Sequence, residues 1–267
     1  MASKKEVFVF VDSHCHLDRL DKNGPALDEV VKQALAANVE HMLCVAVSVK
    51  EFAQMKSTVG HYPDVSMSCG VHPLHNEDVC DYETLLAHAQ YDDVVAVGET
   101  GLDYFYSEET ASVQMKSFVD HIKVANVVKK PLIIHTRSAQ EDTLQALKEN
   151  YDPRTGAVLH CFTESLEMAQ AAMQMGIYIS ISGIVTFSSA KELQETVKQI
   201  PLDKLLIETD SPWLAPVPFR GKKNEPKHVI EVAKFIAKLK GVSIEKLAQH
   251  TTENFYRLFT HINRGSI

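Results

Sequence analysis

The sequence predicts an α/β fold of the TIM-like (β/α)8 barrel type, regular or distorted, formed by one domain over residues 1–267. Short apolar runs rich in β-branched residues alternate with amphipathic helical stretches, as they do where helices join parallel strands. Eight such runs occur along the chain. A length of 267 residues fits one barrel of about 250 residues better than two smaller domains.

Each of the eight apolar runs is a predicted strand. In chain order they are Val7–Val11, Met42–Val47, Val65–Val71, Val94–Gly98, Leu132–His135, Ala157–His160, Ile177–Ile181 and Leu205–Ile207. Continuous apolar runs are typical of parallel strands that are covered on both faces. Between them, Ser112–Val128 and His228–Lys240 carry apolar residues at helical spacing. The proline-rich stretch Ser211–Pro226 follows the last strand and is predicted to be a long ordered loop.

Composition and charge narrow the class of protein. Hydrophobic residues make up 45% and charged residues 23% of the chain, which excludes disordered, collagen-like and coiled-coil classes. The formal net charge of −8 disfavours a protein that coats duplex nucleic acid, although it leaves room for a local phosphate site. No apolar run near the start is long enough for a signal peptide or membrane span. Five cysteines without a CxxC pair predict free thiols in the cytoplasm, or the nucleus of a eukaryote.

Side chains that can bind metal follow five of the predicted strands, at the ends where such barrels carry their active sites. They are His14, His16, Glu99, His135, His160 and Asp210. Because alternate residues of a strand share a face, these side chains are expected to top the interior columns of the barrel. By the same parity the neighbouring Cys15 and Cys161 are expected to pack outward. Six ligands are too many for one tetrahedral zinc and suit two divalent ions bridged by a carboxylate.

The motifs around these residues resemble those of the TatD-type metal-dependent hydrolases, within the amidohydrolase-like superfamily. The motifs are Asp12-Ser-His-Cys-His-Leu-Asp18, Gly98-Glu-Thr-Gly-Leu-Asp-Tyr104, His135-Thr-Arg137, His160-Cys-Phe162 and Glu208-Thr-Asp-Ser-Pro212. Related amidohydrolases often bridge their metals with a carboxylated lysine at the fourth strand, and Glu99 stands in that place. The resemblance implies that Glu99 bridges two ions, one held with His14, His16 and Asp210 and the other with His135 and His160.

The resemblance also implies a function, which is that of a deoxyribonuclease. Family members are 3′-5′ exonucleases on single-stranded or damaged DNA ends, and some cut at abasic sites. Two divalent ions would generate hydroxide from water for in-line attack on phosphorus, with Asp210 and Glu99 as catalytic groups. Family assays commonly use magnesium, whereas imidazole ligands favour zinc, manganese, iron or nickel. The expected partner is single-stranded DNA, with neither a membrane nor an obligate protein partner.

Two residues beside the predicted ligands have alternative roles. His72, in the Gly70-Val-His-Pro73 segment, either contacts substrate or orients a ligand, or it is structural. Asp103 either orients a ligand histidine or caps the helix that follows it.

Two arginines are candidates for contact with a phosphate. Arg137 shares a strand face with His135 and could bind phosphate in a bidentate way, or pair with a neighbouring carboxylate. Arg220 belongs to a basic cluster with Lys222 and Lys223, which either contacts substrate or forms a solvated loop.

Two other functions are compatible with the same ligand set. A two-metal site attacks a carbonyl carbon as readily as phosphorus, so hydrolysis of an ester, lactone or amide such as a D-aminoacyl-tRNA stays open. The basic residues of the loops favour phosphate. A non-catalytic scaffold that binds metal is a more remote alternative.

Overall fold

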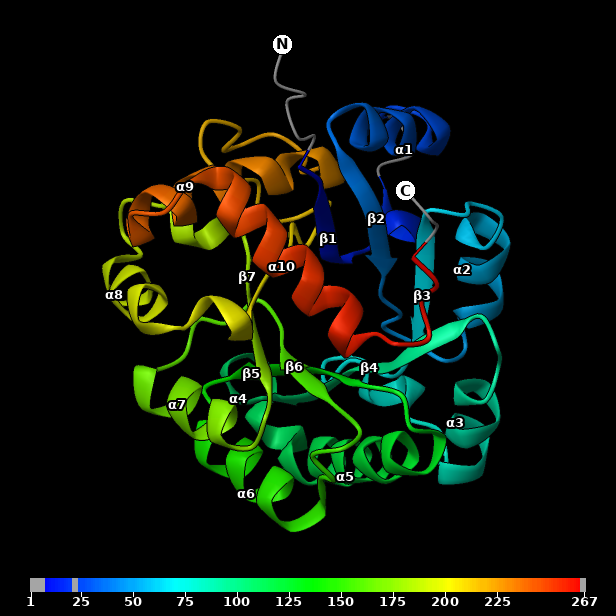
Figure 1. Ribbon diagram of the computed structural model, residues 1–267. Helices are drawn as coiled ribbons and strands as arrows, with labels where there is room; N and C mark the ends of the chain where they lie inside the picture. The colour runs from blue at the N-terminus through cyan, green and yellow to red at the C-terminus, as the bar shows by residue number, and fades with distance from the viewer. Residues whose placement is uncertain (1–7, 21–23, 265–267) are drawn as a thin grey trace, which may run out of the picture.

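The computed structural model describes residues 8–20 and 24–264, so Val7 of the first predicted strand lies outside the described residues. Eight parallel strands follow one another around a single sheet, and helices surround it (Figure 1). The strands are β1 Phe10–Cys15, β2 Val39–Cys44, β3 Val65–Cys69, β4 Val94–Asp103, β5 Leu132–Arg137, β6 Ala157–Leu159, β7 Tyr178–Ile181 and β8 Leu205–Ile207. The predicted (β/α)8 class and its eight strands are confirmed, with the bounds of several strands shifted.

The first eight helices occupy the connections between the strands, as crossovers in a parallel sheet require, and the last two follow β8. They are α1 Leu27–Ala36, α2 Phe52–Val59, α3 Tyr82–Ala89, α4 Tyr104–Ser107, α5 Ala111–Val128, α6 Gln140–Asn150, α7 Leu166–Gln174, α8 Lys191–Gln199, α9 Val229–Lys240 and α10 Ile244–Leu258. Short 3-10 turns link several of these elements. The helices predicted at 112–128 and 228–240 are therefore confirmed to within one residue. No helix among the described residues is both long and apolar enough to cross a membrane.

The last helix, α10, covers one end of the barrel (Figure 1). Its Phe255 and Leu258, with the following Phe259, pack against side chains that fill the barrel interior. These interior residues include Val11, Leu43, Val45, Val95, Ile133, Val158 and Leu206. Asn254 donates to the carbonyl oxygen of Leu205, the first residue of β8, which places α10 at the amino ends of the strands. The carboxyl ends of the strands are left for the site.

The first and last strands meet at a seam with few ladder contacts. The backbone nitrogen of Asp210 donates to His14 O at 2.9 Å, and that of His16 donates to Ser211 O at 2.8 Å. Below these, the buried Asp12 carboxylate accepts from Thr209 N at 2.8 Å and from Thr209 Oγ1 at 2.5 Å. The side chain of Asp12 therefore supplies hydrogen bonds that regular strand pairing supplies elsewhere in the sheet.

The expectation that alternate residues of a strand share one face is met in β5, β6 and β8, but it is not met in β4. A register shift between Val97 and Thr100 interrupts the pairing of β4 with β5. A second register shift, in the pairing of β4 with β3, falls at Val95, so Val95 packs in the barrel interior whereas Val97 packs in the outer layer under the helices. The expected common face of Val95, Val97 and Glu99 is therefore wrong, because an irregularity in the strand turns Glu99 back toward the mouth.

A buried histidine on α5 supports the loop after β3. His121 Nδ1 donates to Ser117 O at 2.7 Å, which leaves Nε2 to accept from Val71 N at 3.0 Å. Burial lowers the pKa of His121 to about 4. The neutral imidazole thus holds the backbone immediately before His72.

Lowering the pH from 7 to 5 is expected to destabilise the fold by about 2 kcal/mol through His121 alone. An unfolded histidine titrates near ~6.5, above the pKa of about 4 in the folded chain. The unfolded chain therefore binds more protons, so this stability is present above pH ~6.5 and is lost as the pH falls toward 4. Urea unfolding at the two pH values measures the loss.

The matched variants are His121→Gln and His61→Gln, since His61 is exposed. Glutamine does not titrate, so His121→Gln should lose about 2 kcal/mol less than the wild type between pH 7 and 5. His61→Gln should keep the wild-type pH dependence. An unaltered pH dependence in His121→Gln would contradict this role.

Candidate metal centre

The residues predicted as metal ligands lie together at the carboxyl ends of the strands. His14 and His16 come from β1 and the residue after it, Glu99 from β4 and His135 from β5. His160 follows β6 and Asp210 follows β8. All but His14 line a cavity of about 730 Å³ at this mouth. Two overlapping groups of these residues lie close enough to hold a metal ion, and a third such group includes His72. The groups are His14, Glu99 and His160; His14, His16 and Asp210; and His72, Glu99 and His135.

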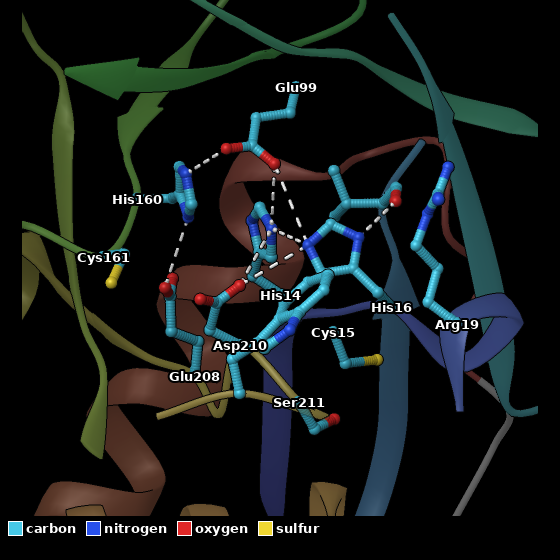
Figure 2. Close-up of polar contacts among 12 residues, drawn as sticks. His14, Cys15, His16, Arg19, Glu99, His160, Cys161, Glu208, Asp210 and Ser211 are labelled. Carbon is cyan, nitrogen blue, oxygen red and sulfur yellow. Dashed lines mark hydrogen bonds and ion pairs between the residues drawn. The ribbon is translucent and has the colours of Figure 1, made fainter. Parts of the chain in front are cut away.

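Glu99 lies at the middle of the cluster, and its two oxygens face different histidines (Figure 2). Oε2 lies 3.4 Å from His14 Nε2 and 3.8 Å from His16 Nε2. Oε1 lies 2.6 Å from His160 Nε2 and 3.2 Å from His135 Nδ1. One carboxylate therefore connects two sets of imidazole nitrogens, and its side chain is only 3% exposed.

His14, His16 and Asp210 form one side of the cluster. The two histidine Nε2 atoms are 3.1 Å apart. Asp210 Oδ1 lies 3.8 Å from His14 Nε2 and 3.4 Å from His16 Nε2. Because two imidazole nitrogens and a carboxylate oxygen converge on one point, a cation there would satisfy all three.

Hydrogen bonds on the far side of three rings orient the histidines. His16 Nδ1 donates to Val45 O at 2.8 Å, and His160 Nδ1 donates to Glu208 Oε1 at 3.3 Å. His135 Nε2 donates to Asp103 Oδ2 at 2.9 Å. Each bond holds the proton on the outer nitrogen, so the lone pair of the inner nitrogen points into the cluster. Such outer partners are typical of histidines that ligate metals.

The pKa values of Glu99 and His14 are shifted in the directions that metal ligation needs, whereas neighbouring carboxylates outweigh burial and raise the pKa values of His16, His135 and His160. Burial alone would raise the pKa of Glu99, but His160, His72, His135 and His14 hold that pKa well below its usual range. Burial lowers the pKa of His14, which favours the neutral ring that a metal needs. His14 Nδ1 is buried and makes no hydrogen bond within the described residues. Histidine nitrogens with carboxylate oxygens fit zinc, manganese, iron or nickel.

His72 differs from the other histidines of the cluster. Its Nδ1 accepts from Leu74 N at 3.1 Å, so the neutral ring carries its proton on Nε2. That nitrogen lies 3.3 Å from Glu99 Oε1 and can donate to it. We therefore place His72 as a donor to Glu99, which agrees with the orienting alternative of the sequence prediction.

The hydrogen bonds of Asp103 are compatible with both of its predicted roles. Its Oδ2 accepts from His135, and its Oδ1 accepts from Tyr106 N at 2.9 Å at the start of α4. The same carboxylate thus orients a histidine and caps the helix.

The two arginines lie in different surroundings. Arg137 lines the cavity and packs against the rings of Phe105 and Tyr106, at 4.1 and 4.5 Å from their centroids. Within residues 8–20 and 24–264 it forms no ion pair with a carboxylate. Arg220 is exposed, packs on the Phe187 ring at 3.7 Å and does not line this cavity, so its contact with substrate stays a prediction.

Two further residues at the mouth of the barrel have no role that was predicted from the sequence. Glu208 is fully buried and orients His160, and its position two residues before Asp210 was a usable signal. Trp213 lies over the cluster with its ring centroid 5.1 Å from that of His16.

The two cysteines beside the candidate ligands have different surroundings. Cys15 packs in the core and donates to Leu43 O, as expected, whereas Cys161 reaches the cavity wall.

A parallel barrel with this cluster of histidines and carboxylates at its mouth has the architecture of a metal-dependent hydrolase. Comparisons with known proteins agree. The family model described as TatD related DNase matches residues 11–260. The chain belongs to the TatD family, and it is a metal-dependent hydrolase of that family.

Individual relatives cover almost the whole chain. The uncharacterized metal-dependent hydrolase YcfH of Escherichia coli K12 is 50% identical over 259 residues, 96% of this chain and 97% of that protein. A protein of Escherichia fergusonii named 3′-5′ ssDNA/RNA exonuclease TatD is 35% identical, with 87% and 92% covered. The crystal structure of YJJV, a TatD homolog from Escherichia coli K12, has a TM-score of 0.86 at 29% identity, with 94% and 98% covered.

Replacing Asp103 with asparagine is expected to weaken metal binding about 10- to 100-fold. Asparagine has one side-chain oxygen, so it cannot accept from both Tyr106 N and His135 Nε2. Competition with a chromophoric chelator for Zn²⁺ measures the affinity. Asp81→Asn is the control, because Asp81 caps α3 by accepting from Thr84 N. Equal affinities in Asp103→Asn and the wild type would refute the orienting role.

Proposed function

We propose that the protein is a divalent-metal-dependent phosphodiesterase that removes nucleotides from the 3′ ends of single-stranded DNA. The observation that carries this proposal is the position of Arg137 on the wall of the cavity that contains Glu99 and Asp210. A guanidinium that forms no ion pair with a carboxylate in the described part of the chain, beside a cluster of candidate metal-binding groups, matches the charge and geometry of a phosphodiester. The name of the Escherichia fergusonii relative supports the same substrate class.

We further propose a two-ion centre. Glu99 supports it, because Oε2 faces His14 and His16 whereas Oε1 faces His135 and His160. Asp210 completes the first group of ligands. Two ions would lower the pKa of water and offset negative charge on the phosphoryl oxygens.

Individual side chains have separate roles in the proposed reaction. The Asp210 carboxylate is 15% exposed, against 3% for Glu99, so Asp210 is the acid group that reaches a water molecule in the cavity. Burial raises the pKa of Asp210, but the hydrogen bond to His16 and the charges of the imidazoles bring that pKa below its usual value. Asp210 is thus ionised and able to accept a proton from the attacking water. Arg137 holds a non-bridging oxygen of the phosphate, and His72 fixes Glu99.

Asp210→Asn is expected to lower kcat on a single-stranded, labelled oligodeoxynucleotide about 10²- to 10⁴-fold. Amide nitrogen cannot accept the proton, and one ligand oxygen is lost. Chelation should abolish wild-type activity and a divalent ion should restore it. Asp203→Asn is the control, since Asp203 is exposed on the 3-10 turn before β8. Full turnover by Asp210→Asn at full metal occupancy would contradict the role of Asp210 as the proton acceptor.

The same preparation separates the proposal from a carbonyl hydrolase. A D-aminoacyl-tRNA tested beside the oligonucleotide reports hydrolysis at carbon. Turnover of the aminoacyl ester alone would reject the phosphodiesterase.

Arg137→Ala is expected to raise KM for the oligonucleotide about tenfold. It should also make the slope of log(kcat/KM) against log salt concentration shallower by about 1, the value for one phosphate contact. The physical reason is the loss of one phosphate contact. Steady-state kinetics over a range of salt concentrations measure both effects. Arg154→Ala is the control, because Arg154 is 84% exposed and pairs with Asp152 before β6. An unchanged salt dependence in Arg137→Ala would argue against the contact.

A further inference from the structure

Three large aromatic side chains are exposed at the mouth of the cavity. Tyr106 is 62% exposed, Phe105 58% and Trp213 47%. Tyr106 and Trp213 also line the cavity, and Phe105 is next to Tyr106 in the chain. We call these three residues the aromatic rim. Exposed aromatic surface beside a charged site indicates a ligand with flat apolar faces.

The rim has two parts on opposite sides of the mouth. Trp213 follows β8, and Phe105 and Tyr106 follow β4. Strands four places apart in a barrel of eight lie across from each other, since the strand order is sequential. Trp213 lies beside His16, and Tyr106 lies beside Arg137. The Glu99 carboxylate lies between His16 and His135.

Both parts are tied to aspartates of the site. Trp213 N donates to Asp210 O at 2.9 Å, and Asn224 Nδ2 donates to Trp213 O at 2.7 Å. Tyr106 N donates to the Asp103 carboxylate. The backbones that carry the exposed rings are thus held in place relative to the candidate metal ligands.

Arg137 joins the second part of the rim to the phosphate. Its guanidinium packs on the Phe105 and Tyr106 rings, and it lines the cavity. An aromatic face and a cation side by side match the alternating bases and phosphates of an unpaired strand.

We propose that the aromatic rim binds unpaired bases by stacking, one on Trp213 and one on the Tyr106 side, on either side of the phosphate that is cut. This inference rests on the proposed phosphodiesterase function and specifies its substrate as a strand with unstacked bases. A base inside a duplex is stacked on both faces, so neither face is free to stack on an aromatic side chain. Stacking on an aromatic side chain is tolerant of sequence, so the rim selects single strands without selecting bases.

The test uses the fluorescence of Trp213, which is the one tryptophan of the chain. Metal-loaded protein is titrated with a short all-phosphorothioate oligodeoxynucleotide, which resists cleavage, and with a strand of equal length made of abasic spacers. The base-containing strand should quench the fluorescence and bind about 100-fold more tightly, since each of the two stacked bases contributes about tenfold. The abasic strand should bind without quenching.

Variants distinguish stacking from a structural role. Because the Trp213 variants lack the only tryptophan, the affinities of all variants for the two strands are measured by titration calorimetry. Trp213→Ala and Tyr106→Ala should each reduce the preference for bases about tenfold, and Trp213→Phe should restore most of it. Tyr91→Ala is the matched control, because Tyr91 is 45% exposed and precedes β4 at the other end of the barrel. It should keep the full preference.

The outcomes separate this inference from the proposed function. If the wild type cleaves ordinary oligonucleotides but binds both strands equally without quenching, the rim has no stacking role while the phosphodiesterase stands. The same holds if Trp213→Ala and Tyr106→Ala both keep the preference for bases. If the wild type neither binds nor cleaves any oligonucleotide, both proposals fall.

Discussion

The seam between β8 and β1 is the constraint on which the site depends. The Asp12 carboxylate binds Thr209 N and Thr209 Oγ1 across this seam, where ladder pairing is sparse. Two residues further on, the backbone of Asp210 is bonded to His14. Candidate ligands from the two ends of the sequence therefore lie close together, because a buried acid bonds the first strand to the segment after the last. The candidate metal centre and the closure of the fold are parts of one hydrogen-bonded structure.

The sequence predicted most of the fold and the candidate ligands for a simple physical reason. Buried parallel strands are apolar throughout, so a polar residue at a strand end stands out, as His135 and His160 do. Parity failed where backbone geometry is irregular, at Val97, because a register shift has no signature in side-chain polarity. The alternatives for Asp103 could not be resolved either, since only coordinates show that each of its oxygens has its own partner.

Residues reached through the tertiary fold were the hardest to predict. Arg220 lies in a basic run of the sequence, yet its guanidinium packs on Phe187. Trp213 stands next to a predicted ligand motif, but its exposure depends on how Asn224 holds the loop. Charge and hydrophobicity in the sequence say which chemistry is present, whereas long-range hydrogen bonds decide which side chains face the cavity.

The helix α10 gives the barrel only one open end. Phe255, Leu258 and Phe259 close the other end against a packed interior. A polymer cannot pass through such a molecule, and whatever enters the mouth must leave by it. For the proposed phosphodiesterase, a chain terminus can point into this blind cavity, whereas a continuous strand would have to bend in and out again. The closed end of the barrel thus makes substrate entry and product release share one opening.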